Sequence, residues 1–191
     1  MIISLVDISF VSLLIMFIWI YLGSFGIPGI LLLAISAGVL AKSLPQLLLV
    51  MLVIFIALIL GDISVYEISR KLSVPVLNKL RKFSFFRNNE NSVRKLLGKY
   101  EFLLVFFTRF AVVALCVVTS YISGLEKLNR KKYYTAVVSG EALYAVIYPS
   151  IGFLIGITLS SLLSAINEFL IVLVLISVIV YYAGKFLAKR M

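Results

Sequence analysis

Long apolar runs separated by short polar stretches follow one another along the whole chain. Four of these runs, residues 8–23, 46–69, 133–160 and 162–184, contain few or no charged residues. A helix needs about 20 apolar residues to cross a hydrocarbon core about 30 Å thick. The pattern predicts an N-terminal helix at 8–23 and transmembrane helices at 46–69, 133–160 and 162–184.

A fifth apolar run, residues 24–41, is interrupted by residues that break helices. It contains Pro28, Gly29 and Gly38. Proline removes a helical hydrogen bond, and glycine favours turns. We therefore predict a re-entrant hairpin, which enters and leaves the membrane on one side, with these three residues at its tight turns. Non-helical backbone at membrane depth is tolerated only where protein buries it or where it lines a wet cavity.

Residues 70–99 form a long hydrophilic stretch. They carry half of the eighteen Lys and Arg residues. Within them, Val76, Leu80 and Phe83 recur at helical spacing among basic residues. This spacing predicts a basic amphipathic segment on the cytoplasmic side of the membrane. The sequence leaves open whether its basic face contacts anionic lipid or only water.

The sixth apolar run, residues 101–123, contains Arg109. A single crossing would place the basic loop at 124–132 outside the cell. A hairpin would keep both flanking basic segments in the cytoplasm, as the positive-inside bias prefers. We therefore predict a second re-entrant hairpin at 101–123, with Gly124 at its closing turn.

The order of hairpin and then helix occurs twice, at 24–69 and at 101–160. The first hairpin would enter from outside and the second from inside, so the two halves form an inverted repeat. Many transporters build a binding site at the membrane midplane in this way. We predict an all-α, polytopic membrane protein with a single domain over residues 1–191 and two opposed re-entrant hairpins. Its C-terminus is expected in the cytoplasm.

Composition agrees with a membrane protein and argues against other classes. Hydrophobic residues make up 63% of the chain and charged residues 14%, which lies outside the usual range of soluble domains. Cytoplasmic basic segments explain the net charge of +10 better than nucleic-acid binding does. The sequence has no His, one Cys, and no nucleophile beside a base in a recognisable spacing. We therefore expect no enzyme activity, no metal site and no cofactor.

Charged residues inside the membrane segments are the candidate site. An Arg at the centre of a transmembrane helix costs roughly 2.5–3.5 kcal/mol on insertion scales, so Arg109 should face a cavity or a counter-charge. Its guanidinium could bind a phosphate headgroup, form a structural ion pair with Asp62 or Glu141, or extend to the surface. Tyr133 is predicted to anchor the chain at the membrane interface. The candidate substrate-binding residues are Arg109, Asp62, Glu141, Arg70 and Tyr66.

Several short motifs follow one another along the chain. They are IPG followed by SAGVLA from Ile27, GDISVYEISR from Gly61, FFTRF around Arg109, and GFLIG from Gly152. Together they resemble the DedA family, also called the VTT or SNARE-associated Golgi domain family. Val112 stands where that family usually carries a proline, so the resemblance is to a divergent member.

The resemblance implies a pair of facing re-entrant hairpins and a role in moving lipids between leaflets. The implied cargo is a polyprenyl-phosphate carrier in the cytoplasmic membrane, and its anionic headgroup is the expected partner. A small-ion or proton-coupled exporter, a phospholipid scramblase and a membrane assembly factor are the alternatives. We expect no nucleic-acid partner, and the sequence leaves a homodimer open.

Overall fold

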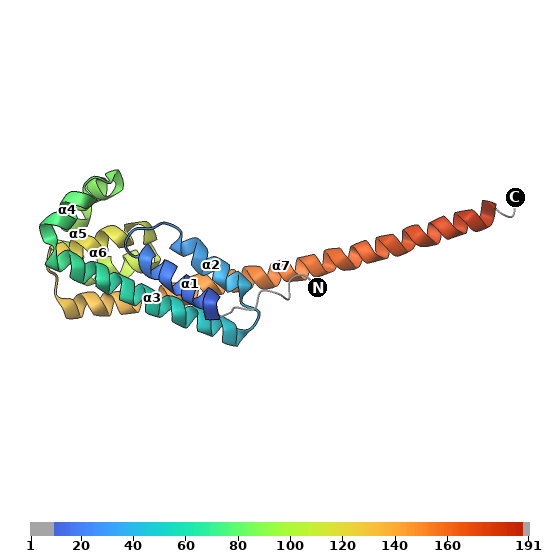
Figure 1. The fold of residues 1–191 in the computed structure, drawn as a ribbon, viewed down its shortest axis with the longest axis horizontal. Helices are drawn as coiled ribbons and strands as arrows, with labels where there is room; N and C mark the ends of the chain where they lie inside the picture. The colour runs from blue at the N-terminus through green and yellow to red at the C-terminus, as the bar shows by residue number, and fades with distance from the viewer. Residues whose placement is uncertain (1–9, 189–191) are drawn as a thin grey trace.

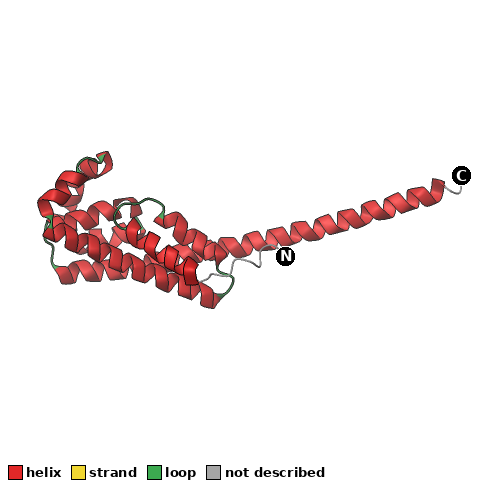
Figure 2. Cartoon of the chain, viewed as in Figure 1, coloured by secondary structure: helices red, strands yellow, loops and turns green. Residues whose placement is uncertain are grey.

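Helices make up nearly the whole structure. The computed structural model describes the backbone of residues 10–188 and, within that range, the side chains outside residues 73, 74, 76 and 160–188. It is 87% helical and has no strand in these residues (Figure 2). The elements are α1 (Phe10–Gly23), α2 (Ile30–Leu40), α3 (Leu44–Lys71), α4 (Ser73–Leu80), α5 (Ser84–Phe110), the 3₁₀ turn η2 (Val113–Leu115), α6 (Cys116–Leu125) and α7 (Arg130–Ala188). The predicted all-α class is confirmed, and residues 8 and 9 of the predicted first helix lie outside the described residues.

Among the described residues, two helical stretches are long and apolar enough to cross a membrane. They are α3 and the first part of α7, residues 130–159. Pro45 lies in the first turn of α3, where its missing N–H would have no helical partner in any case. Arg70 and Lys71 lie in the last turn, where positive charge favours the negative end of the helix dipole. The helix predicted at 46–69 is therefore confirmed as α3.

Residues 24–41 form one turn and one helix instead of both arms of a hairpin. The chain turns at 24–29, where Gly26 and Gly29 have φ angles of 113° and 108°. Helix α2 then continues through Gly38 without a break. The 14 residues of α1 and the 11 of α2 give lengths of about 21 and 16 Å, short of a 30 Å hydrocarbon core. The helical hairpin in this region therefore consists of α1 and α2, with Pro28 and Gly29 in its turn.

The second broken region follows Arg109 closely. Helix α5 is kinked at Tyr100, whose φ and ψ are −135° and 51°. After Phe110 the chain bends, and the axes of α5 and of segment 113–125 differ by 116°. Such a bent apolar pair is either a broken membrane span or a re-entrant loop. This bend lies within residues 101–123, the run predicted to form the second hairpin.

Helix α7 is continuous over 59 residues, and Figure 1 shows it extending well beyond the other helices. At 1.5 Å per residue it is about 88 Å long. The prediction of two antiparallel helices at 133–160 and 162–184 is therefore wrong. No Gly or Pro lies between Gly156 and Gly184 to end the helix. The expected cytoplasmic C-terminus depended on that second crossing.

Glycines allow several helices to cross with their backbones in contact. A Cβ on Gly38 would lie 2.0 Å from the carbonyl oxygen of Pro149 in α7, and one on Gly152 would lie 2.0 Å from a carbonyl oxygen of α2. A Cβ on Gly124 would lie 2.4 Å from the Tyr66 carbonyl oxygen. Small residues commonly mark such close crossings of membrane helices. Gly38 and Gly124 are therefore packing residues inside helices, not the turn residues that the sequence predicted.

Two ion pairs and a short loop bring the end of α3, the start of α7, the kink of α5 and the end of α6 to one end of the bundle. Arg130 Nε lies 2.7 Å from Glu67 Oε1, which joins the start of α7 to the end of α3. Lys132 Nζ lies 3.3 Å from Glu101 Oε2, just after the kink in α5. Helix α6 ends at Leu125, and a short loop connects it to α7. The apolar half of α5 thus begins at the same end of the bundle at which α6 finishes.

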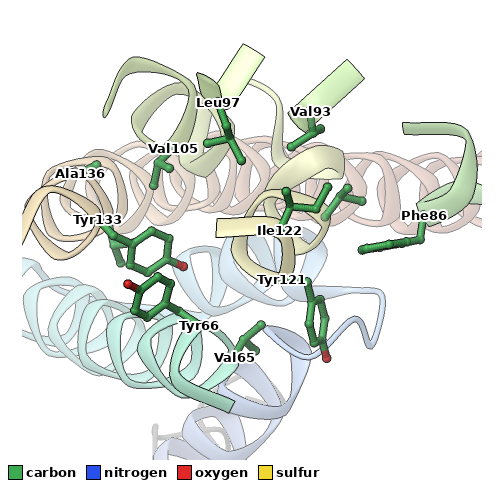
Figure 3. Packing of buried hydrophobic residues seen from close by; sticks show 12 residues of the cluster. Val65, Tyr66, Phe86, Val93, Leu97, Val105, Tyr121, Ile122, Tyr133 and Ala136 are labelled. Carbon is green, nitrogen blue, oxygen red and sulfur yellow. The ribbon is translucent and has the colours of Figure 1, made fainter. Parts of the chain in front are cut away.

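A buried hydrophobic cluster holds these four helices together (Figure 3). Tyr66 and Tyr133 stack within it, with ring centroids 4.2 Å apart. The other members that Figure 3 labels are Val65, Phe86, Val93, Leu97, Val105, Tyr121, Ile122 and Ala136. The cluster fixes α3, α5, α6 and α7 around the charged residues described next.

Candidate functional site

Arg109 lies in the last turn of α5 and is 1% exposed. Its neighbour Phe107 is 48% exposed, so the outer face of this turn is apolar and the inner face is charged. Gly140 of α7 packs directly below Arg109, because a Cβ there would lie 2.7 Å from the Arg109 Cβ and 2.8 Å from the Phe106 carbonyl oxygen. A glycine at this position lets α5 approach α7 closely enough to bury the guanidinium.

The guanidinium of Arg109 donates to side chains from three helices. Its Nη1 lies 2.7 Å from Asp62 Oδ2 of α3, which forms a buried ion pair. Nη1 also donates to Cys116 Sγ at 2.6 Å and to Ser120 Oγ at 2.9 Å, both in α6. Nη2 donates to the Tyr133 hydroxyl of α7 at 3.1 Å. Such charge-assisted hydrogen bonds are stronger than neutral ones, so Arg109 ties α3, α5, α6 and α7 together.

Glu141 lies beside this ion pair but is held less closely. Its Oε1 is 3.9 Å from Arg109 Nε. Among the described atoms, neither Arg109 Nε nor Glu141 Oε2 has a hydrogen-bond partner. The ligand atoms of Asp62, Glu141 and Cys116 all lie within 4.8 Å of one another, close enough to share one metal ion. Arg109 already donates to Asp62 and Cys116, and its guanidinium supplies one positive charge to this group.

Tyr66 and Arg70 form a second set of contacts at the edge of this cluster. The Tyr66 hydroxyl donates to the Leu128 carbonyl oxygen at 2.5 Å. Arg70 Nη1 donates to the same carbonyl at 2.7 Å and to the Tyr66 hydroxyl at 2.6 Å. Tyr66 contacts the Arg109 cluster by stacking on the Tyr133 ring. The structure therefore brings Arg109, Asp62 and Glu141 together and places Tyr66 and Arg70 nearer the end of the bundle.

Three residues of the cluster were not among the predicted site residues. Cys116 and Ser120 are four positions apart, so they share a face of α6, and this spacing was the available signal. Tyr133 was predicted to anchor the chain at the membrane interface. It is 1% exposed instead, because its hydroxyl reaches inward to Arg109 and to the Asp62 carbonyl oxygen at 3.3 Å.

An apolar cavity of about 440 Å³ lies between the turn that precedes α2 and the bend that follows α5. Pro28 and Gly29 line it from the turn before α2, and Val113, Ala114 and Val117 line it from η2 and α6. The remaining lining residues come from the same two regions and from the α4–α5 corner: Gly23, Phe25, Gly26, Ile27, Ile30, Leu31, Leu80, Phe83, Phe85, Phe86 and Val118. The cavity thus borders the N-terminal ends of both α2 and α6.

The cavity and the charged cluster are close neighbours in the fold. Val117 lines the cavity, and the preceding residue, Cys116, accepts a hydrogen bond from Arg109. The first turn of α6 therefore separates the apolar space from the buried guanidinium. Of the predicted turn residues, Pro28 and Gly29 lie at the cavity, whereas Gly38 and Gly124 lie at helix crossings.

No protein-family model, curated protein or solved structure matches this chain. Its class is therefore defined by its own features. The part that the structure describes is all-helical, with two helices long and apolar enough to span a membrane and with one bent apolar helix pair. At the bend, a buried arginine pairs with a carboxylate of another helix.

Proposed function

We propose that this protein moves an anionic lipid between the leaflets of a membrane, with a polyprenyl phosphate as the favoured cargo. The observation that supports this function best is the apolar cavity at which two helix N-termini meet beside the buried Arg109. A lipid of this kind needs an apolar space for its chain next to groups that bind phosphate.

The N-terminus of α2 offers phosphate-binding groups at the cavity, whereas the first N–H of α6, that of Cys116, already donates to the Val113 carbonyl oxygen. The first N–H groups of a helix have no partner within the helix, and the helix dipole is positive there. Gly29 caps α2 without a side-chain hydrogen bond. A Cβ at Gly29 would meet no atom within 4 Å, so there is open space beside this cap. Broken helices that point their N-termini at an anionic substrate are a recurring device of transporters.

Arg109 is the proposed partner for the phosphate once the cargo has entered. In the structure its Nη1 pairs with Asp62 at 2.7 Å, and Asp62 then takes the place that a phosphate oxygen would occupy. Arginine binds carboxylates and phosphates with the same planar fork of donors. The cargo headgroup would therefore replace Asp62 as the counter-charge, and the guanidinium would never be left unpaired.

The same proposal includes the topology. The turn before α2 and the break after α5 would be the tips of two opposed re-entrant hairpins, related as an inverted repeat. The contact between Glu101 and Lys132 supports entry and exit of the second hairpin at one end of the bundle. That end carries Arg70, Lys71 and the basic start of α7, so the positive-inside bias assigns it to the cytoplasm. Membership of the DedA family and location in the cytoplasmic membrane are part of this proposal.

Reconstitution into liposomes with a radiolabelled polyprenyl phosphate tests the function. Wild-type protein should move the lipid across the bilayer faster than empty liposomes allow, and Arg109→Ala should abolish this movement. Arg130→Gln is a matched control, because it removes an arginine whose ion pair lies at the protein surface. No movement above empty liposomes with folded wild-type protein would refute the proposal.

A second variant avoids the buried ion pair altogether. Ala114 lines the cavity but makes no contact that holds Arg109. Ala114→Phe should fill part of the cavity and block transport while the fold survives. Normal transport by this variant would show that the cavity does not hold the lipid chain.

A further inference from the structure

The charges in the buried cluster do not balance. Asp62 and Glu141 carry one negative charge each when ionised, and Arg109 carries one positive charge, so the ionised cluster has a net charge of −1. All three residues are 1% exposed. An uncompensated charge that is buried away from water is strongly unfavourable. The cluster therefore needs one further positive charge.

Glu141 differs from the other carboxylates whose side chains the structure describes. Of the eight Asp and Glu residues, six have described side chains, and Asp7 and Glu168 lie outside that set. Five of the six have a Lys or Arg nitrogen within 3.3 Å: Asp62, Glu67, Glu90, Glu101 and Glu126. The ion-pair contact of Glu141 is 3.9 Å long and reaches an arginine that Asp62 already neutralises.

The groups that surround Glu141 supply no second cation. Within the described residues, α3 contributes Asp62, α5 contributes Arg109, and α6 contributes the Cys116 thiol. On α7 itself Tyr144 lies one turn away, and its buried hydroxyl has no hydrogen-bond partner among the described atoms. Helices α1 and α2 carry no charged residue at all. The missing positive charge must therefore be supplied by a bound proton or by a bound metal ion.

We propose that Glu141 is a proton-binding site and that the resting protein holds one proton on its carboxyl group. Two carboxyl groups this close together in a buried site share a proton because both cannot ionise at once. Asp62 has the shorter contact with Arg109, so Asp62 keeps its charge and Glu141 takes the proton. This protonated state belongs to the protein without bound cargo, so the proposal does not depend on lipid transport.

A proton fits this site better than a metal ion does. A metal ion at Asp62, Glu141 and Cys116 would lie beside the Arg109 guanidinium, whose Nη1 is 2.7 Å from Asp62 and 2.6 Å from Cys116. The metal ion and the guanidinium would share the same ligand atoms, and two positive centres so close together repel each other strongly in a buried site. A proton on Glu141 neutralises the excess charge without placing a second cation beside Arg109.

Loss of this proton would change the partner of Arg109. An ionised Glu141 would compete with Asp62 for the guanidinium. It faces the unpartnered Arg109 Nε at 3.9 Å, so a movement of about 1 Å would give an ordinary charge-assisted hydrogen bond. Asp62 lies on α3 and Glu141 on α7. Release of the proton would therefore shift the ion pair of Arg109, just before the bend, from α3 to α7. The site thereby couples protonation to the conformation of the broken region.

Infrared spectroscopy of the purified full-length chain in dodecyl maltoside tests the proposal, since this detergent has no ester carbonyl to mask the signal. At pH 7 wild-type protein should show the carbonyl band of a protonated carboxyl group, shifted on transfer to D₂O. Glu141→Gln should lose the band, whereas Glu67→Gln, which removes an ion-paired glutamate, should keep it. Raising the pH should remove the band from wild-type protein and leave Glu141→Gln unchanged.

Two control variants test whether another carboxyl group carries the proton. Asp7→Asn and Glu168→Gln are measured in parallel, because their side chains lie outside the described residues. A band that follows either of these residues would overturn the assignment to Glu141. The wild-type spectrum is a test even where a variant fails to fold, because absence of the band at pH 7 also overturns the proposal.

Discussion

Replacing Asp62 and Glu141, singly and together, measures how Arg109 is held. Asp62→Asn removes the partner at 2.7 Å, but Glu141 can lose its proton and take over the pairing. We therefore expect a loss of about 1.5–3 kcal/mol in the free energy of unfolding, the usual range for a hydrogen bond to a charged group. Glu141→Gln imitates the neutral carboxyl group and should cost less than about 1 kcal/mol.

The double variant should be worse than the sum of the two single variants. With both carboxyl groups replaced, Arg109 is a buried charge without a counter-charge, and such a loss costs about 3–5 kcal/mol. Each single change leaves one carboxylate to pair with Arg109, whereas the double change leaves none. The interaction free energy between the two substitutions should therefore be unfavourable, of the order of 1 kcal/mol or more.

Equilibrium unfolding in mixed dodecyl maltoside and SDS micelles at pH 7 gives these free energies. Glu67→Gln serves as the control, because the Arg130 side chain of that ion pair is 54% exposed and such exposed pairs contribute about 0–1 kcal/mol. Additive effects of the two substitutions would refute the shared role of the carboxyl groups. A larger loss for Glu141→Gln than for Asp62→Asn would assign the charge to Glu141 instead.

Two further predictions concern packing and topology. Gly140→Ala should destabilise the protein by about 1–3 kcal/mol through overpacking against Arg109. Gly98→Ala is the control, because a Cβ there meets no atom within 4 Å, and it should be neutral or stabilising by up to about 1 kcal/mol. Thermal unfolding compares the stability of the two variants. Single cysteines at positions 100 and 127, introduced into a Cys116→Ser variant, should be labelled from the same side of the membrane by an impermeant maleimide, and labelling from opposite sides would refute the second re-entrant hairpin.

The depth of a charge in an apolar run was enough to predict that Arg109 needs a partner. The energy of burying a guanidinium requires a counter-charge in any fold, so Asp62 and Glu141 could be selected as candidates before the structure was known. The sequence could not decide between them, because they lie on different helices, 47 and 32 positions from Arg109 in the chain. Only the packing of α5 and α3 against α6 and α7 fixes which oxygen lies at 2.7 Å and which at 3.9 Å.

Glycine positions were the least predictable part of the fold. A glycine in an apolar run can end a helix or allow a second helix to cross it, and both uses leave the same residue in the sequence. Gly29 adopts a φ of 108° and belongs to a turn, whereas Gly38 remains helical and contacts Pro149 of α7. The second use depends on a partner more than 100 residues away, which no local pattern contains.

The ion pair between Arg109 and Asp62 is compatible with a role for Arg109 in binding cargo. A buried guanidinium needs a counter-charge at every stage of a transport cycle, so in the absence of cargo a protein carboxylate must supply it. What separates a purely structural pair from a binding site is whether the counter-charge can be exchanged without leaving the arginine unpaired. Glu141 lies 3.9 Å from an unpartnered nitrogen of the same guanidinium, and the cavity begins at Val117, next to Cys116. Exchange therefore requires only small movements of groups that already surround Arg109, and a headgroup that enters through the cavity would find the guanidinium on the far side of a single helical turn.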